Sequence, residues 1–296
     1  MRVRYLDTGE GAPGWNMGLD AALLAGAERR PTLRVYGWRE PAVSLGRFQQ
    51  LARDQAPPAL RSLPWVRRPS GGGAVLHRDE LTYAIAAPLA ALGGGRPRRG
   101  ALRAAIAAVH AALLEALDRL GIAAELRNGA TGRCAAEMAP ARGPAGGAQA
   151  SGGCEPLPAA PRPGAGDEPA LCYERARGAA IFAGGRKLIA SAQRHAGRAL
   201  LMHGAIPLGA RPNAPAATTV RLAAGRPVSR AELAAALRAA FAARLGWQLV
   251  EGELERAEHE LVAVLAPPVD PPPQRGGVAA GPSAGQQARG VGCVLD

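Results

Sequence analysis

Short runs of β-forming residues occur in two clusters along the chain, and helical patterns lie between and after these clusters. The runs span 32–38, 42–47, 63–68 and 81–87 in the first cluster, and 171–177, 179–183, 187–193 and 200–207 in the second. Strands grouped in this way favour an α+β fold. We therefore expect a central mixed or antiparallel sheet that is flanked by helices.

Apolar side chains recur at intervals of three and four residues in the segments predicted as helices. These segments are about 100–120, 229–245 and 253–265. Ser229 and Glu232 form a capping-box pattern at the start of the second helix, and Gly246 stands where it should end. A further helix near the N-terminus is predicted to begin at Asn16, whose side chain is suited to capping.

Two segments lack the large apolar side chains that a folded core requires. Residues 139–169 cannot offset the entropy of ordering, and residues 266–296 begin with a proline cluster and continue in Gly, Ala and Gln. We interpret the first as a disordered insert and the second as a disordered C-terminal tail. The predicted catalytic domain is residues 1–265.

The formal net charge is +12, and the excess is arginine scattered along the chain. No basic run interleaves with stacking aromatics, so we expect no nucleic-acid partner, although an acidic protein could be steered by this charge. The sequence has no signal-peptide core and no apolar stretch of about 18 residues. These features predict a cytoplasmic protein without a membrane partner. The four cysteines show no zinc-ligand spacing, so we expect no metal site.

Three consecutive glycines, Gly71 to Gly73, follow a predicted strand that ends in Arg67 and Arg68. One interpretation is a loop whose N–H groups bind an anion at close range, with the arginines adding donors suited to carboxylate or phosphate. The other is a glycine-rich hairpin turn. The segment is not a P-loop, because no Gly-Lys-Ser/Thr sequence closes it.

Lys187 is the only lysine, so 35 of the 36 lysine and arginine residues are arginine. If arginine could replace it, we would expect arginine here too. Lysine differs by its compact charge and its ability to lose a proton when desolvated, so we interpret Lys187 as functional. Cys172 precedes it by fifteen residues. A lone cysteine is usually a small buried apolar residue, but a nearby ammonium would lower the pKa of its thiol and create a nucleophile.

The order of these segments resembles the lipoate–protein ligase and octanoyltransferase family, which shares its catalytic fold with biotin–protein ligase. The matching stretches are WREPAVSLGRFQ (38–49), RRPSGGGAVLHRDELTY (67–83), LCY (171–173), GRKLIASAQ (185–193) and LMHGAIPL (201–208). The resemblance covers about residues 1–265 apart from the insert. It implies that the glycine loop and the lysine lie on facing walls of a tunnel that holds an acyl chain.

The resemblance implies catalytic roles for Cys172 and Lys187. The predicted substrate-binding residues are Arg68, Ser70, Gly71, Gly72, Gly73, His77, Ser191 and His203. From the residues alone, single histidines in strand-rich segments are more typical of orienting roles, which applies to His77 and His203.

Two chemistries occur in the family that the chain resembles. Octanoyltransferases take octanoate from acyl carrier protein through a cysteine thioester and use no cofactor, whereas ligases activate lipoate with ATP and Mg²⁺ as an acyl-adenylate. Cys172 matches the transferase branch in its aromatic neighbour and its spacing to Lys187. We therefore expect octanoyl (or lipoyl) transfer to a lysine of a lipoyl carrier domain, such as glycine cleavage H protein or a 2-oxoacid dehydrogenase subunit.

Two alternatives remain open at this point. One is an ATP-dependent lipoate–protein ligase that acts through lipoyl-AMP. The other is a non-catalytic carrier-binding module, which is suggested by departures from the family pattern. Ala190 stands where glycine is common, and Ala205 stands where serine is common. The added methyl group at 190 could narrow the tunnel and change the chain-length preference.

Overall fold

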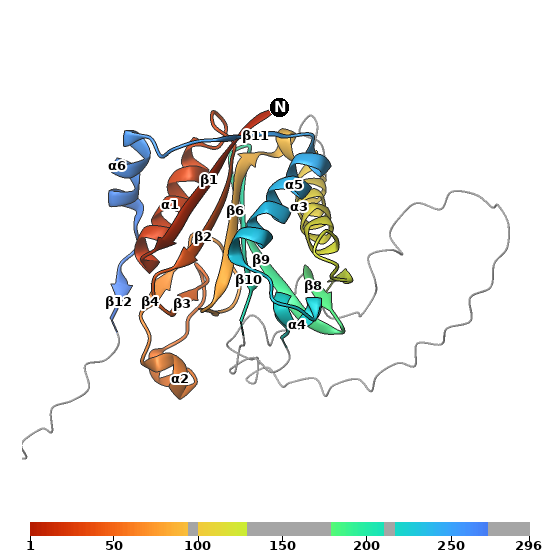
Figure 1. Cartoon of the computed structure of the whole chain (residues 1–296). Coiled ribbons are helices and arrows are strands. Elements are labelled where there is room, and N and C mark those ends of the chain that lie inside the picture. The colour runs from red at the N-terminus through yellow and green to blue at the C-terminus, as the bar shows by residue number, and fades with distance from the viewer. Residues whose placement is uncertain (94–99, 129–178, 210–216, 272–296) are drawn as a thin grey trace, which may run out of the picture.

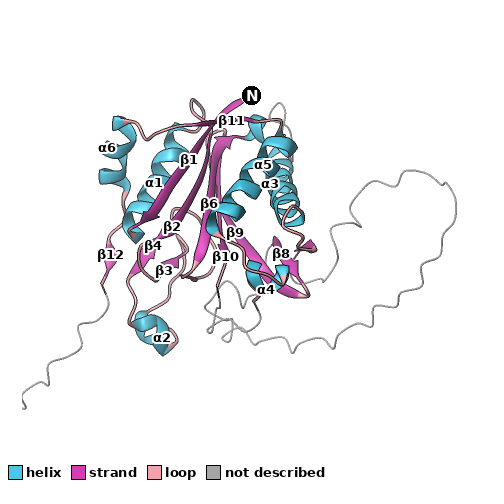
Figure 2. Cartoon of the chain, in the orientation of Figure 1, coloured by secondary structure: helices cyan, strands magenta, loops and turns pink. Residues whose placement is uncertain are grey.

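A computed structural model describes residues 1–93, 100–128, 179–209 and 217–271. Its central sheet has the strand order β11-β1-β2-β6-β10-β9-β8-β7. These strands are β1 (Arg2–Gly11), β2 (Thr32–Trp38), β6 (Glu80–Pro88), β7 (Ala124–Asn128), β8 (Ala179–Ala183), β9 (Arg186–Ala196), β10 (Ala199–Pro207) and β11 (Gln248–Glu251). Strand β1 runs parallel to β2 and β11, and the other neighbours are antiparallel. The predicted mixed sheet is confirmed (Figure 2).

A second, smaller sheet has the order β12-β4-β3-β5. Its strands are β3 (Ala42–Leu45), β4 (Trp65–Arg67), β5 (Val75–His77) and β12 (Val269–Asp270). Strand β4 pairs with one edge of β3 and β5 with the other. The glycine segment at 68–74 therefore crosses from one side of β3 to the other. The hairpin-turn interpretation is wrong, because β4 and β5 are not paired with each other.

Helices cover both faces of the central sheet (Figure 1). The helices of the described ranges are α1 (Pro13–Gly26), α2 (Pro58–Arg61), α3 (Ala101–Asp118), α4 (Val220–Ala224), α5 (Arg230–Leu245) and α6 (Arg256–Leu265), with short 3-10 turns at Arg53–Gln55 and Leu89–Leu92. Of these, α2 packs against the small sheet. The predicted cap of α5 is confirmed, since Ser229 Oγ accepts from the Glu232 N–H and Gly246 ends the helix in the left-handed conformation. No helix in the described ranges is long and apolar enough to cross a membrane.

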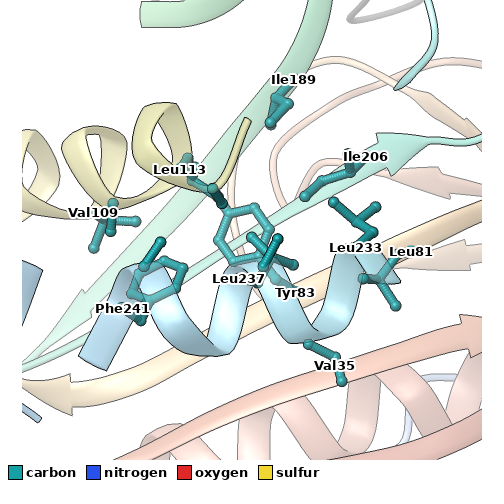
Figure 3. Close-up of a cluster of buried hydrophobic side chains, with 14 of the residues drawn as sticks. Val35, Leu81, Tyr83, Val109, Leu113, Ile189, Ile206, Leu233, Leu237 and Phe241 are labelled. Carbon is teal, nitrogen blue, oxygen red and sulfur yellow. The ribbon is translucent and has the colours of Figure 1, made fainter. Parts of the chain in front are cut away.

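The side chains of β6 alternate between two hydrophobic cores, one on each face of the central sheet. Leu81, Tyr83 and Ile85 pack with α3 and α5, whereas Ala84 and Ala86 pack with α1 on the other face. Side chains alternate between the faces of a strand, so a strand that is buried on both sides reads as a continuous apolar run. Figure 3 shows the first core, in which Tyr83 lies among side chains of both helices.

The start of α1 differs from the prediction. The helix begins at Pro13, which suits the first helical position because proline has no N–H to lose there. Asn16 lies inside the helix and is fully buried. Its side-chain amide donates to the carbonyl oxygens of Gly11 (3.1 Å) and Gly37 (2.9 Å), so Asn16 joins α1 to β1 and β2 instead of capping the helix.

The predicted tail begins too early. Val269 and Asp270 of β12 pair with Val66 and Trp65 of β4, so the chain remains ordered past residue 266. The pairing stabilises a segment whose own composition gives no folding signal. The predicted insert at 139–169, the predicted strand at 171–177 and the chain from 272 onward lie outside the described residues.

Candidate functional site

A cavity lies where the α1-facing side of the central sheet meets the small sheet. The lining residues come from α1, from six strands of the two sheets and from the glycine segment with its flanks: Met17, Tyr36, Ser44, Arg68, Gly72, Val75, His77, Thr82, Ala190, Ser191, Ala192, His203, Gly204 and Ala205.

Two rows of cross-strand neighbours form the floor of this cavity. Thr82, Ala205 and Ala190 are opposite one another on β6, β10 and β9, and His203 lies opposite Ala192 in the next row. Ala190 and Ala205, the two departures from the family pattern, are therefore direct register partners on the cavity floor. A change at either position alters the space that the other position faces.

A β-bulge between β8 and β9 reverses the direction of the side chains along β9. Ile181 pairs with Ile189, but the next residue, Phe182, pairs with Lys187, so Leu188 is an extra residue. Leu188 and Ile189 both pack in the α3-facing core. A bulge of this kind re-aims the side chains that precede it. Lys187 consequently shares a face with Phe182, opposite Ile189.

Lys187 thus lies on the cavity side of the central sheet, because Ala190 is on this face too. Lys187 is 4% exposed, and its carbonyl oxygen accepts from the Thr218 N–H at 2.9 Å. It is not itself among the cavity-lining residues. The structure therefore places the lysine beyond one end of the cavity and buried.

Arg68 shapes the glycine segment. Its guanidinium donates to the carbonyl oxygens of Gly71 (2.6 Å), Gly73 (2.8 Å) and Ser44 (3.0 Å). The segment also lies close to the chain after β3, where a Cβ atom on Gly46 would stand 2.0 Å from the Gly72 carbonyl oxygen. Arg68 was predicted to contact substrate. It lines the cavity, but these donors bind backbone carbonyls of the protein.

Ser70 and His203 connect this segment to the central sheet. The Ser70 Oγ atom lies 2.5 Å from Nε2 of His203, and His203 Nδ1 lies 2.7 Å from Oδ2 of Asp20. The Tyr36 hydroxyl also donates to Asp20 Oδ2, at 2.9 Å. All four side chains are buried. A serine, a histidine and an aspartate therefore form one hydrogen-bonded chain, in which Asp20 orients the imidazole.

Arg34 contacts Asp20 at the end of this hydrogen-bonded chain. Its guanidinium forms an ion pair with Asp20 at 2.7 Å, and both side chains are 0% exposed. Burial opposes ionisation of Asp20, but the Arg34 charge and the His203 hydrogen bond outweigh it and hold the pKa of Asp20 below its usual value. Burial, together with the Asp20 charge, raises the pKa of Tyr36 well above its usual value. Asp20 is therefore a fixed negative charge behind His203.

His77 belongs to a second buried network. Its Nδ1 lies 2.7 Å from Glu80 Oε1, its Nε2 lies 2.7 Å from Ser44 Oγ, and its ring stacks on Trp38 at 3.8 Å between centroids. The Thr82 hydroxyl donates to the same Glu80 oxygen at 2.9 Å. Both ring nitrogens of His77 thus contact protein atoms, which is consistent with an orienting role.

Ser191 lines the cavity, but its hydroxyl lies 2.7 Å from the hydroxyl of Tyr83. Tyr83 reaches it across Gly204, where a Cβ atom would stand 2.9 Å from the tyrosine ring and 2.8 Å from the Ala190 carbonyl oxygen. Glycine at 204 therefore permits the contact between the core tyrosine and the edge of the cavity.

The structure brings together most of the predicted site residues but not all of them. Arg68, Gly72, His77, Ser191 and His203 line the cavity, whereas Ser70, Gly71 and Gly73 stand behind them in the glycine segment. Cys172 lies outside the described residues. Nor do those residues contain a group of three or more His, Cys, Asp or Glu side chains that could hold a metal ion.

Sequence reasoning missed Asp20 and Arg34. Each is a charged residue inside an otherwise apolar segment, Asp20 between Leu19 and Leu23 and Arg34 between Leu33 and Val35. A charge is rarely buried unless it is paired. Two opposite charges on predicted core positions were therefore a usable signal for a buried pair.

The sequence matches the lipoyl protein ligase A/B catalytic domain family over residues 12–219. It is 36% identical over 218 residues to octanoyltransferase LipM of Moorella thermoacetica, covering 69% of this chain and 64% of that relative. It is 32% identical over 284 residues to octanoyltransferase LipM of Symbiobacterium thermophilum, covering 87% and 92%. The fold is similar to that of protein Ta0514 from T. acidophilum, solved with bound lipoic acid (TM-score 0.63, 19% identity, covering 90% and 95%).

Proposed function

This chain belongs to the lipoyl protein ligase A/B catalytic domain family, and on that basis we propose that it transfers an octanoyl group to a lysine of a lipoyl carrier domain. The proposed donor is octanoyl acyl carrier protein, and the proposed intermediate is a thioester on Cys172. No cofactor is needed for this route, because the thioester is already activated.

The observation that carries the proposal is the placement of Lys187 relative to the cavity. The floor of the cavity presents the small side chains of Ala190, Ala192 and Ala205, which suit an unbranched acyl chain. The only lysine of the protein lies on the same face of β9, beyond one end of this floor. An acyl chain in the cavity would therefore direct its polar end towards a buried cation.

In the proposed first step, the Lys187 ammonium polarises the donor carbonyl and lowers the pKa of the Cys172 thiol. The thiolate attacks the carbonyl carbon, the carbon–sulfur bond of the donor breaks, and the donor thiol leaves with a proton. N–H groups of the glycine segment are candidates to stabilise the oxyanion, and each such donor is typically worth about 3 kcal/mol.

In the proposed second step, the carrier lysine attacks the acyl-enzyme as a free amine. The new amide bond forms as the bond to the Cys172 sulfur breaks, and the proton lost by the amine passes to the departing Cys172 thiolate. The cysteine and the lysine thus return to their starting states, so one cycle moves one acyl group.

Intact mass spectrometry after mixing with octanoyl acyl carrier protein tests the covalent step. We expect one octanoyl group on the wild-type protein, assigned to Cys172 by peptide mapping. Cys134→Ala is the matched control and should still be acylated, whereas Cys172→Ala should be neither acylated nor active. Octanoyl transfer by a wild-type enzyme that never acquires an acyl group would exclude this route.

The same variants separate the two alternatives. An ATP-dependent ligase would show pyrophosphate exchange that requires lipoate, and Cys172→Ala would retain full activity. In that mechanism Arg68 would assist Lys187 at the adenylate, but the donors of Arg68 described above bind Gly71, Gly73 and Ser44. A non-catalytic module would bind a lipoyl domain and transfer nothing from either donor.

A further inference from the structure

An aromatic side chain and two arginines stand together on the surface after β3. Phe48 is 81% exposed, which is unusual for so large an apolar residue. The Arg47 guanidinium lies over its ring, 5.5 Å from the centroid. Both side chains line a groove that also includes Leu51 and Arg67. Arg47 and Phe48 belong to the GRFQ stretch at 46–49, for which the cavity gives no role.

The positive charge of this surface comes from Arg47 and Arg67, which line the same groove. Neither side chain has an ion pair with a carboxylate of the described ranges, whereas Arg226 and Arg230 on the same protein do have one. Two arginines that line one groove and form no ion pair within these ranges favour an acidic partner.

The surface is attached directly to the glycine segment. The Arg47 N–H donates to the Ser70 carbonyl oxygen at 2.8 Å. Arg67 donates to the carbonyl oxygens of Gly46 (2.8 Å) and Gln49 (3.0 Å), which braces the backbone beneath Phe48.

We propose that Arg47, Phe48 and Arg67, which line one groove, form the docking surface for the acidic carrier protein that delivers the acyl group. The proposal rests on the proposed function, since it assumes that the donor is a carrier-bound thioester. Arginine and large aromatic residues dominate the binding energy of protein interfaces, and here they are combined on a braced loop. A carrier that docks at this surface is beside the glycine segment, so its acyl arm has a short path to the cavity.

The test compares two donors that share one thioester. Octanoyl acyl carrier protein can use the docking surface, whereas octanoyl-pantetheine has no protein to dock. Arg47→Glu and Phe48→Ala should each lower kcat/KM for the carrier donor by about tenfold or more and leave octanoyl-pantetheine within about twofold. The matched controls are Arg103→Glu on α3 and Val264→Ala on α6, which are exposed positions away from this surface. High salt should lower the wild-type rate with the carrier donor towards that of Arg47→Glu.

A binding measurement makes the test independent of catalysis. Titration calorimetry should show weaker binding of octanoyl acyl carrier protein to Arg47→Glu than to wild type. Equal binding by wild type and Arg47→Glu, or equal losses of kcat/KM with both donors, would overturn the assignment of this docking surface. Reduced binding of DNA or anionic lipid vesicles, with carrier binding intact, would overturn the assigned partner. If wild type transfers octanoate from neither donor, the proposed function fails, and the binding comparison still decides the surface.

Discussion

The Nε2 atom of His203 lies 2.5 Å from the Oγ atom of Ser70, which joins the central sheet to the residue before the glycine triplet. His203 is in turn held by Asp20 of α1, and Asp20 by Arg34 of β2. The glycine segment is therefore positioned by a chain of buried contacts that begins in the main core. Its place above the cavity does not depend on the small sheet alone.

This relationship predicts that Ser70 and His203 act as one unit. Ser70→Ala and His203→Asn should each lower kcat/KM by about tenfold, and the double variant should lose little more than either single one, because a shared contact can be lost only once. Steady-state kinetics on the four proteins measures the coupling. Additive losses would show that the two side chains act separately.

Asp20→Asn should destabilise the protein by about 3–5 kcal/mol, because it leaves Arg34 charged and unpaired in the core. The control is Asp7→Asn, which breaks the partly exposed pair with Arg230 and should cost no more than about 1 kcal/mol. Urea unfolding of both variants gives the comparison. Similar losses of unfolding free energy in the two variants would mean that the buried Asp20–Arg34 pair contributes no more than the partly exposed pair.

Lys187→Arg should reduce acyl transfer by about 100-fold or more while the protein still folds, since losing one aligned donor typically has this effect. Arginine keeps the charge but presents a wider, planar group in a space where the lysine is 4% exposed. The measurement is octanoyl transfer together with the thermal midpoint. Near wild-type activity in this variant would show that charge alone is sufficient.

Ala190→Gly should shift the chain-length preference towards longer acyl groups, because it removes a methyl group from the cavity floor. The effect should depend on residue 205, which lies directly opposite. Competition between octanoyl and decanoyl donors gives the ratio of kcat/KM for Ala190→Gly, Ala205→Ser and the double variant. Unchanged ratios in all three would exclude these positions as determinants of chain length.

We predict that mild acid lowers the free energy of unfolding, because His110 on α3 is buried. Burial lowers its pKa from 6.5 to about 4, and its Nε2 has no hydrogen-bond partner within the described ranges. Above pH 6.5 the ring is neutral in both states. As the pH falls from 6.5 towards 4, the unfolded chain binds a proton that the folded protein does not, so stability falls by at most about 3 kcal/mol.

The check for His110 is urea unfolding between pH 7 and pH 4.5. His110→Leu should have a flatter dependence on pH than wild type, whereas His259→Gln, at an exposed position, should follow wild type. If wild type and His110→Leu lose stability in parallel, other groups are responsible.

Local patterns were sufficient to predict much of the fold. The run at 32–38 matches β2, the segment at 100–120 contains α3, and Ser229 with Gly246 marks the two ends of α5. These elements have strong periodicity or caps, which are properties of neighbouring residues. Strand β12 was missed, because its two residues form a strand only through their pairing with β4.

The residues of the candidate site also divide into those that the sequence could identify and those that it could not. The glycine triplet and the single lysine could be identified from the sequence, because each is a local or compositional anomaly. The Ser70–His203–Asp20 chain could not, since its members come from the glycine segment, β10 and α1 and are separated by up to 183 residues.

The sequence by itself determined the α+β class and most of the elements, and it singled out Lys187 as a candidate, because these depend on residue type and short-range spacing. Only the tertiary structure decided which face Lys187 occupies, because one extra residue in β9 reverses the alternation of its side chains. It also decided that Arg68 and His203 fix the glycine segment, since their partners are distant in sequence. Such contacts exist only after the two sheets have packed together.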